Sequence, residues 1–175
     1  ADGSDSKILV AYPMPKEHSW IEGPGWSASG KRFAWTSQSM YGHSDEQNAF
    51  IFNNETGRVF RFFPTNVQIG EMIWSPRGDL LMISFYSHPK QHIETVVIYD
   101  AISDKILQII NAGRPTDEQA YYMRKYWSSN GEQLFLINPR EITVASKDGY
   151  RTIQASMDAS DFCTSYASLP HQFHN

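Results

Sequence analysis

The sequence predicts an all-β protein built from repeated four-stranded antiparallel sheets. Aromatic residues make up 14% of its 175 residues and charged residues only 19%. Aromatic side chains pack well on the pleated, half-buried surface of a sheet, so this balance favours strands. In addition, a Trp-Ser-x-x-Gly motif occurs three times, each copy followed by an apolar run. We expect residues 1–175 to form a single domain, because this length suffices to bury a core.

The repeated motif sets the period of the chain. Its tryptophans are Trp26, Trp74 and Trp127, which are 48 and 53 residues apart. A period of about 40 to 50 residues with a fixed turn signature is typical of an array of supersecondary units. We place the repeats at about 20–65, 68–112 and 121–156.

Each repeat can be divided into four strands. The first strand ends at the tryptophan, and the turn glycine supplies the positive φ that a tight hairpin requires. The second strand is the apolar run after that glycine. The expected third strands are 49–52, 95–99 and 142–145, the second short turns are 54–57, 101–104 and 146–149, and the fourth strands are 58–63, 105–110 and 150–154. Four antiparallel strands per repeat are typical of a β-propeller blade.

The middle repeat carries a family resemblance. Trp74-Ser75-Pro76-Arg77-Gly78, followed by an apolar strand and by Ile98-Tyr99-Asp100, resembles the WD40-like repeat of TolB-type β-propellers. The resemblance covers about residues 20–155 and implies a propeller-like fold. The family usually has Asp just before the turn glycine, where this chain has Ser29, Arg77 and Asn130. The repeats also lack the aspartate of the sialidase Asp box, which argues against a sialidase.

Three blades do not close a ring, because propellers typically have four to eight. The termini contain strand-like residues 7–12 and the aromatic-containing residues 162–166, which together could add a fourth blade and give a small closed ring. Alternatively, the chain is a partial propeller that pairs with a second copy or joins a larger assembly. A β-sandwich of the same hairpins is the rival architecture.

The loops of such blades divide between two ends. The turns between strands one and two, and between three and four, lie at one end and are short. The connections at the other end are long: 37–48, 64–71, 86–94 and 111–125. Binding residues concentrate on long loops of a rigid scaffold. The large, partly polar side chains there are of types enriched at protein interfaces: Tyr41, His43, Tyr86, His88, His92, Tyr121, Tyr122, Arg124 and Tyr126, although Tyr122 and Tyr126 could instead pack between blades.

Other residue patterns suggest metal binding or catalysis, but each lacks a feature that this chemistry requires. His88 and His92 are four residues apart, a zinc spacing on a helix, yet Pro89 and the flanking strands predict a loop. Residues 43–46 have the types of a hydrolase site without a Gly-x-Ser-x-Gly elbow. Cys163 fits a small buried residue better than a nucleophile. We therefore predict no metal, no cofactor and a non-enzymatic protein-binding module (an adaptor, inhibitor or antitoxin-like partner), with a hydrolase or lyase at the propeller axis as the alternative.

Charge and hydropathy limit the partners. The net charge of −4 and the scattered lysines and arginines give no footprint for nucleic acid. No run reaches the roughly 18 apolar residues of a membrane-spanning helix. The chain begins Ala1-Asp2, without Met and without an apolar signal region. We expect either a mature chain after export, hence periplasmic or secreted, or one that starts with residues left by cloning, in which case a cytoplasmic location stays open. The expected partner is another protein, with a homodimer as a further option.

Overall fold

The computed structural model describes residues 19–39, 48–62, 67–86, 94–111, 123–138 and 141–154. Within these ranges the chain forms twelve β-strands and no helix. Blade 1 comprises β1 (Ser19–Trp26), β2 (Arg32–Ser39), β3 (Asn48–Asn53) and β4 (Arg58–Arg61). Blade 2 comprises β5 (Gln68–Trp74), β6 (Leu80–Tyr86), β7 (Glu94–Asp100) and β8 (Lys105–Asn111). Blade 3 comprises β9 (Arg124–Trp127), β10 (Gln133–Ile137), β11 (Glu141–Ser146) and β12 (Gly149–Gln154).

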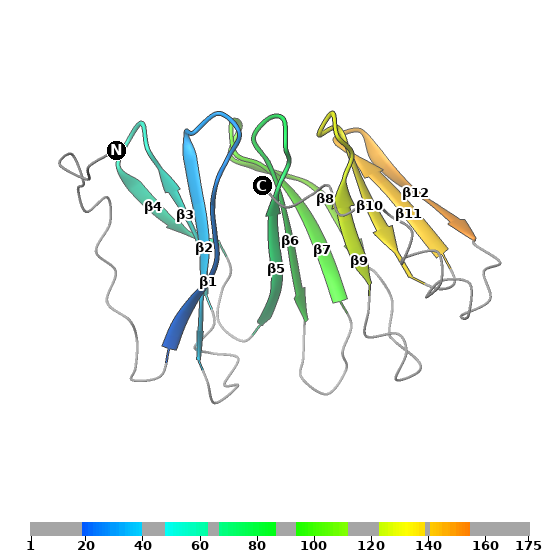
Figure 1. Cartoon of the computed structure of the whole chain (residues 1–175), viewed down its shortest axis with the longest axis horizontal. Helices are drawn as coiled ribbons and strands as arrows, with labels where there is room; N and C mark the ends of the chain where they lie inside the picture. The colour runs from blue at the N-terminus through cyan, green and yellow to red at the C-terminus, as the bar shows by residue number, and fades with distance from the viewer. Residues whose placement is uncertain are drawn as a thin grey trace.

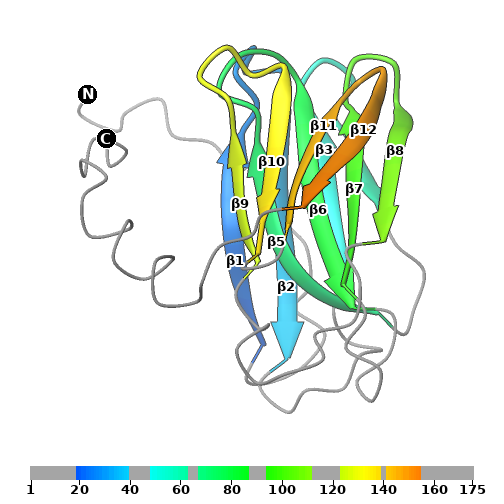
Figure 2. The ribbon, with the colours of Figure 1, turned by 90° about the vertical axis from the view of Figure 1, so that its right-hand side faces the viewer.

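The strands form three separate four-stranded sheets, each with its strands in sequence order. All neighbouring strands are antiparallel, so each sheet is a meander of hairpins. The sheets stand side by side in Figure 1 and one behind another in Figure 2. The predicted all-β, propeller-like array of four-stranded blades is thereby confirmed. The described sheets are not closed into a ring, and the fourth blade expected from residues 7–12 and 162–166 lies outside the described residues.

The Ser-x-x-Gly turns repeat the same geometry. In each, the serine amide donates a 2.8 Å hydrogen bond to the carbonyl of a residue at or next to the start of the second strand. The glycines need the left-handed region because they reverse the chain in a tight hairpin. Their φ values are +70° at Gly30, +110° at Gly78 and +74° at Gly131.

The repeated tryptophans join neighbouring blades. The indole Nε1 of Trp74 donates to the carbonyl oxygen of Gly25 at 2.9 Å, and Nε1 of Trp127 donates to that of Ile73 at 3.0 Å. Gly25 and Ile73 directly precede the tryptophans of their own blades. Blades 2 and 3 therefore each contact the preceding blade through the same hydrogen bond, which explains why the tryptophan recurs.

Blade 2 is packed on both faces. Side chains alternate across a strand, so Leu81 faces blade 1 while Met82 faces blade 3. The whole of β7 except Asp100 is buried, which fits a strand covered on both sides. The junction of blades 1 and 2 contains Ala34, Ile51, Leu81, Ile83, Tyr99 and Ala101. The junction of blades 2 and 3 contains Met82, Val96, Ile98, Ile110, Leu134, Leu136 and Ala145.

Blade 1 carries an aromatic cluster on its other face. Trp35 stacks on Phe50 with 5.2 Å between ring centroids, and Phe33 bridges Trp35 and Trp26. Their cross-strand neighbours are aromatic too, since Phe33 pairs with Phe52. These side chains alternate with Ala34 and Ile51, so they face away from blade 2.

Candidate functional site

The strand ends that carry the long connections lie together at one end of the blades, the lower end in Figure 1. The connections between β2 and β3, between β6 and β7, and between β8 and β9 start and finish there. Six of the predicted binding residues fall on them and lie outside the described residues: Tyr41, His43, His88, His92, Tyr121 and Tyr122. Their role stays a prediction.

The other three predicted residues, Tyr86, Arg124 and Tyr126, are placed by strands, and Tyr126 in β9 is 42% exposed. Tyr86 is the last residue of β6 and pairs with Glu94, the first residue of β7. Arg124 is the first residue of β9 and is exposed. Its neighbour Lys125 faces blade 2, so alternation points Arg124 to the opposite side of blade 3. The structure therefore does not bring Tyr86 and Arg124 onto one surface.

A charged cluster occupies the position beside Tyr86. Lys125 Nζ lies 2.8 Å from Glu94 Oε1 and 3.4 Å from Glu71 Oε2. The side chains of Lys125 and Glu94 are only 5% and 8% exposed, whereas that of Glu71 is 55% exposed. The 2.8 Å separation and the opposite charges hold the buried pair together. Lys125 thus bridges blades 2 and 3 at the end with the long connections.

The interactions within the cluster favour the charged form of Lys125 and the neutral form of Tyr86. Burial alone would lower the pKa of Lys125, but the carboxylates of Glu94 and Glu71 raise it overall. Burial and then the charge of Glu94 raise the pKa of the Tyr86 hydroxyl. Both shifts move titration further above neutral pH. Lys125 therefore stays charged and Tyr86 stays neutral, which suits a structural contact or a binding surface better than proton transfer.

The sequence analysis did not predict the cluster of Lys125, Glu71 and Glu94, although the position of Lys125 in its strand indicates that it needs a charged partner. It stands two residues before Trp127, and the period of a strand places both on the face toward blade 2. A lysine on a buried face needs a partner, because an unpaired buried charge is costly. The sequence could not show that the partners come from β5 and β7.

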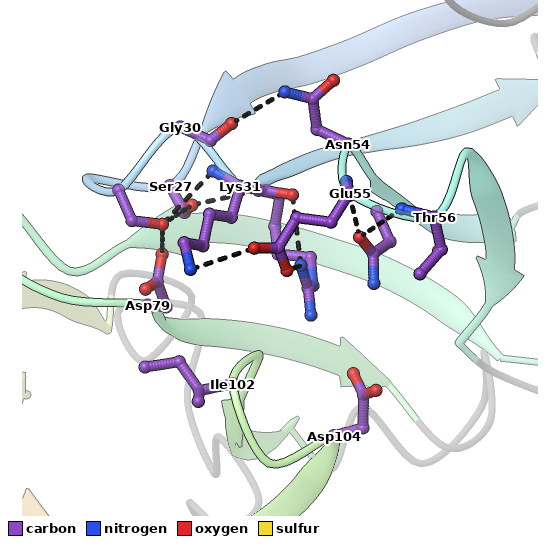
Figure 3. A network of polar contacts seen from close by, with 12 residues as sticks. Ser27, Gly30, Lys31, Asn54, Glu55, Thr56, Asp79, Ile102 and Asp104 are labelled. Carbon is purple, nitrogen blue, oxygen red and sulfur yellow. Dashed lines mark hydrogen bonds and ion pairs between the residues drawn. The ribbon is translucent and has the colours of Figure 1, made fainter.

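The opposite end of the blades is held by polar contacts among short turns (Figure 3). Ser29 Oγ donates a 2.5 Å hydrogen bond to Asp79 Oδ1 across the junction of blades 1 and 2. Burial would raise the pKa of Asp79, but hydrogen bonds from Ser27 and Ser29 lower it overall. At the next junction, Ser75 Oγ donates to the carbonyl of Gly131 at 2.9 Å. The short turns therefore interlock the blades.

Two further expectations concern metals and membranes. Within the described ranges, no three His, Cys, Asp or Glu side chains come together as a metal site. His88 and His92 lie outside those ranges. The part of the chain that the structure describes also contains no helix long and apolar enough to cross a membrane.

Neither a protein-family model nor a curated protein sequence matches the chain. Several solved structures, however, have a similar fold. The β-propeller domain of the Trilobed protease from Pyrococcus furiosus, which has an open velcro topology, superposes with a TM-score of 0.57 at 13% identity, covering 79% of this chain and 44% of that one. A chain from a study of two prolyl endopeptidases gives a TM-score of 0.56 at 14% identity, covering 89% and 24%. A eukaryotic initiation factor gives 0.51 at 16% identity, covering 79% and 34%.

At these identities the likeness concerns the fold alone. The three four-stranded sheets have the arrangement of blades in a β-propeller. The chain spans less than half the length of each of these three structures.

Proposed function

We propose that this chain is a TolB-type propeller segment that binds another protein through the end of its blades that carries the long connections. The observation that supports this most is the contrast between the two ends. The short turns are occupied with holding the blades together, by Ser29 and Asp79 at one junction and by Ser75 and Gly131 at the next. The other end carries the long connections, and long loops on a rigid scaffold are where binding residues concentrate.

The charged cluster fits the floor of such a surface. Glu71 is more than half exposed, yet it is fixed by Lys125, whose side chain is almost fully buried. A fixed carboxylate gives a partner a defined hydrogen-bond acceptor at little cost in side-chain entropy. The acidic balance of the chain suits a partner with a basic patch, because complementary charge accelerates association. Export to the periplasm or outside the cell is part of this proposal.

A pull-down from an extract of the source cell tests the proposal. Wild-type protein is compared with a Tyr121→Ala/Tyr122→Ala variant at the proposed binding end. The matched control is Ile102→Ala at the short-turn end, where Ile102 is 71% exposed. Circular dichroism checks that all three proteins are equally folded.

The retained protein is identified, purified and titrated against each variant by calorimetry. We expect the double variant to weaken binding by at least about tenfold, as is typical when aromatic hot-spot residues are truncated. Ile102→Ala should bind like wild type. A partner that binds the double variant normally but is lost on Ile102→Ala would contradict the proposal.

A further inference from the structure

Glu71 shares its cationic partner with a second carboxylate. Its Oε2 lies 3.4 Å from Nζ of Lys125, and the Glu71 side chain is 55% exposed. Lys125 lies closer to Glu94, at 2.8 Å. Two carboxylates therefore share one ammonium group, so these three side chains carry an excess of one negative charge, and Glu71 is the exposed member that a ligand can reach.

Glu55 provides a comparison at the opposite end of the blades. It lies in the turn between β3 and β4, and its side chain is 53% exposed, nearly as much as that of Glu71. Two cations pair with it, Lys31 at 3.0 Å and Arg32 at 3.5 Å. The excess charge among these three side chains is therefore positive. Of the two equally exposed glutamates, Glu71 has the charge balance that favours a cationic ligand.

A bulge in β5 fixes the position of Glu71. Between the paired residues on either side, β5 has one residue more than β6, so Gly70 and Glu71 both stand opposite Ser84. The backbone N–H of Glu71 donates a 2.9 Å hydrogen bond to Ser84 Oγ. A Cβ at Gly70 would lie 2.5 Å from the same oxygen, so this position requires glycine. Bulges of this kind re-aim a side chain and are frequent beside functional sites.

The ring of Tyr86 lies beside this bulge. A Cβ at Gly70 would be 3.3 Å from Cε2 of Tyr86, so the ring is next to the residue that precedes Glu71. Tyr86 is half-buried and projects from the same face of β6 as Met82, toward blade 3. A carboxylate beside an aromatic ring suits a guanidinium, which forms planar, paired hydrogen bonds and stacks on aromatic rings. A lysine ammonium is a compact charge that uses this arrangement less well.

We propose that Glu71 and Tyr86 recognise an arginine side chain of the partner protein, with the guanidinium paired to the Glu71 carboxylate and packed against the Tyr86 ring. This inference rests on the proposed function, which supplies the partner, and it adds the chemical group that the partner presents. The arginine makes the cluster neutral, because two carboxylates then face two cations. Lys125 stays in place as the buried counter-charge of Glu94.

Titration of the isotope-labelled full chain with N-acetylarginine amide, followed by NMR, tests the site directly. N-acetyllysine amide is the matched probe, because it carries the same charge without the planar guanidinium. Glu71→Gln removes the charge and leaves Lys125 paired with Glu94, so the fold is kept. Glu55→Gln is the matched control, and Tyr86→Leu removes the ring. Circular dichroism confirms that each variant is folded.

The arginine probe should shift the amide signals of Gly70 and Glu71, with a dissociation constant of roughly 1–10 mM. The lysine probe and Tyr86→Leu should each bind about threefold more weakly, the effect of losing a cation–π contact. Glu71→Gln should weaken binding at least about fivefold because it loses a charge-assisted hydrogen bond, and Glu55→Gln should bind like wild type.

The inference is overturned if the arginine probe does not bind, binds Glu71→Gln equally well, or binds no better than the lysine probe. A partner from the extract that is weakened by Tyr121→Ala/Tyr122→Ala but not by Glu71→Gln would also overturn it, while the proposed function would stand. Arginine binding at Glu71 without any retained partner would have the opposite meaning: the site would stand and the proposed function would fall.

Discussion

The two ends of the blades are built from different interactions. At the short-turn end, tight hairpins interlock through neutral or singly charged hydrogen bonds, such as Ser75 to Gly131 and Ser29 to Asp79. At the end with the long connections, one buried lysine joins blades 2 and 3 by charge. The first end has little freedom to change, because backbone and turn geometry fix it. We expect the second end to tolerate variation in its connections as long as Lys125 and its carboxylate partners are kept, because loops on a rigid scaffold vary more readily than the elements they join.

The largest effect should come from breaking the charged cluster. Lys125→Met leaves Glu94 buried without a counter-charge, and removing one partner of a buried pair typically costs about 3–5 kcal/mol. Lys31→Met is the matched control, because Lys31 pairs with Glu55 in an exposed ion pair. Its unfolding free energy should not differ measurably from wild type. Urea denaturation measures the unfolding free energies of both variants and of wild type. Equal losses in the two variants would remove the distinction between buried and exposed pairs.

The same cluster predicts a pH dependence with a defined sign. The neighbouring carboxylates raise the pKa of Lys125 in the folded state above its ordinary value of 10.5. The resulting stability is fully present below about pH 10.5 and is lost as the pH rises through the folded pKa. Wild type should therefore lose more stability than Lys125→Met between pH 10 and 12. Parallel curves in that range would show that Lys125 does not titrate as described.

A somewhat smaller effect is expected at the interlocked turns. Gly131 and Gly30 have nearly the same positive φ, so alanine is strained at both by about 1–2 kcal/mol. A Cβ at Gly131 would in addition collide with Ser75 Oγ and lie 2.5 Å from the Arg77 carbonyl, whereas nothing lies within 4 Å of one at Gly30. Gly131→Ala should lose about 3 kcal/mol and Gly30→Ala about half of that. Identical losses would mean that the turns do not interlock.

The indole bonds between blades should contribute less. Trp74→Phe and Trp127→Phe each leave a backbone carbonyl without its donor, which costs about 1 kcal/mol, plus the smaller ring volume. Because the two junctions use the same contact, the two losses should agree within about 1 kcal/mol. Thermal denaturation compares them. A large loss at one junction with none at the other would show that the repeated tryptophan has different roles.

The smallest effect concerns acid stability at the first junction. Hydrogen bonds lower the pKa of Asp79 in the folded state below its ordinary value of 3.8. Stability from this group is present above about pH 3.8 and is lost as the pH falls through the folded pKa. Asp79→Asn should flatten the acid limb of the stability curve slightly. An unchanged acid limb would indicate that Ser29 does not favour the charged form of Asp79.

The fold was accessible from the sequence because its signals are local. Trp-Ser-x-x-Gly predicts the first hairpin of each blade, since glycine is needed at a positive φ. One short turn had no such signal. Asp104 adopts a φ of +54° in the turn between β7 and β8, and its carboxylate accepts a 2.6 Å hydrogen bond from the hydroxyl of Tyr99 in β7, a contact that no turn signature in the sequence predicts.

The candidate site was less accessible because its contacts are long-range. The connections were identified by length and by their aromatic residues, but Lys125 meets carboxylates from two strands of a different blade. The tryptophan bonds were hidden for the same reason, as Trp74 reaches back to Gly25. The repeated motif predicted the individual blades, whereas the contacts between neighbouring blades became visible only in the structure.

Hydrogen–deuterium exchange with and without the bound partner tests the central claim, that the two ends are divided between scaffold and recognition. Protection on binding should appear in peptides that cover residues 40–47, 87–93 and 112–122. Peptides covering the short turns at 27–30, 101–104 and 146–149 should exchange equally in the free and bound protein. Protection confined to those short turns, with none in the long connections, would contradict the account.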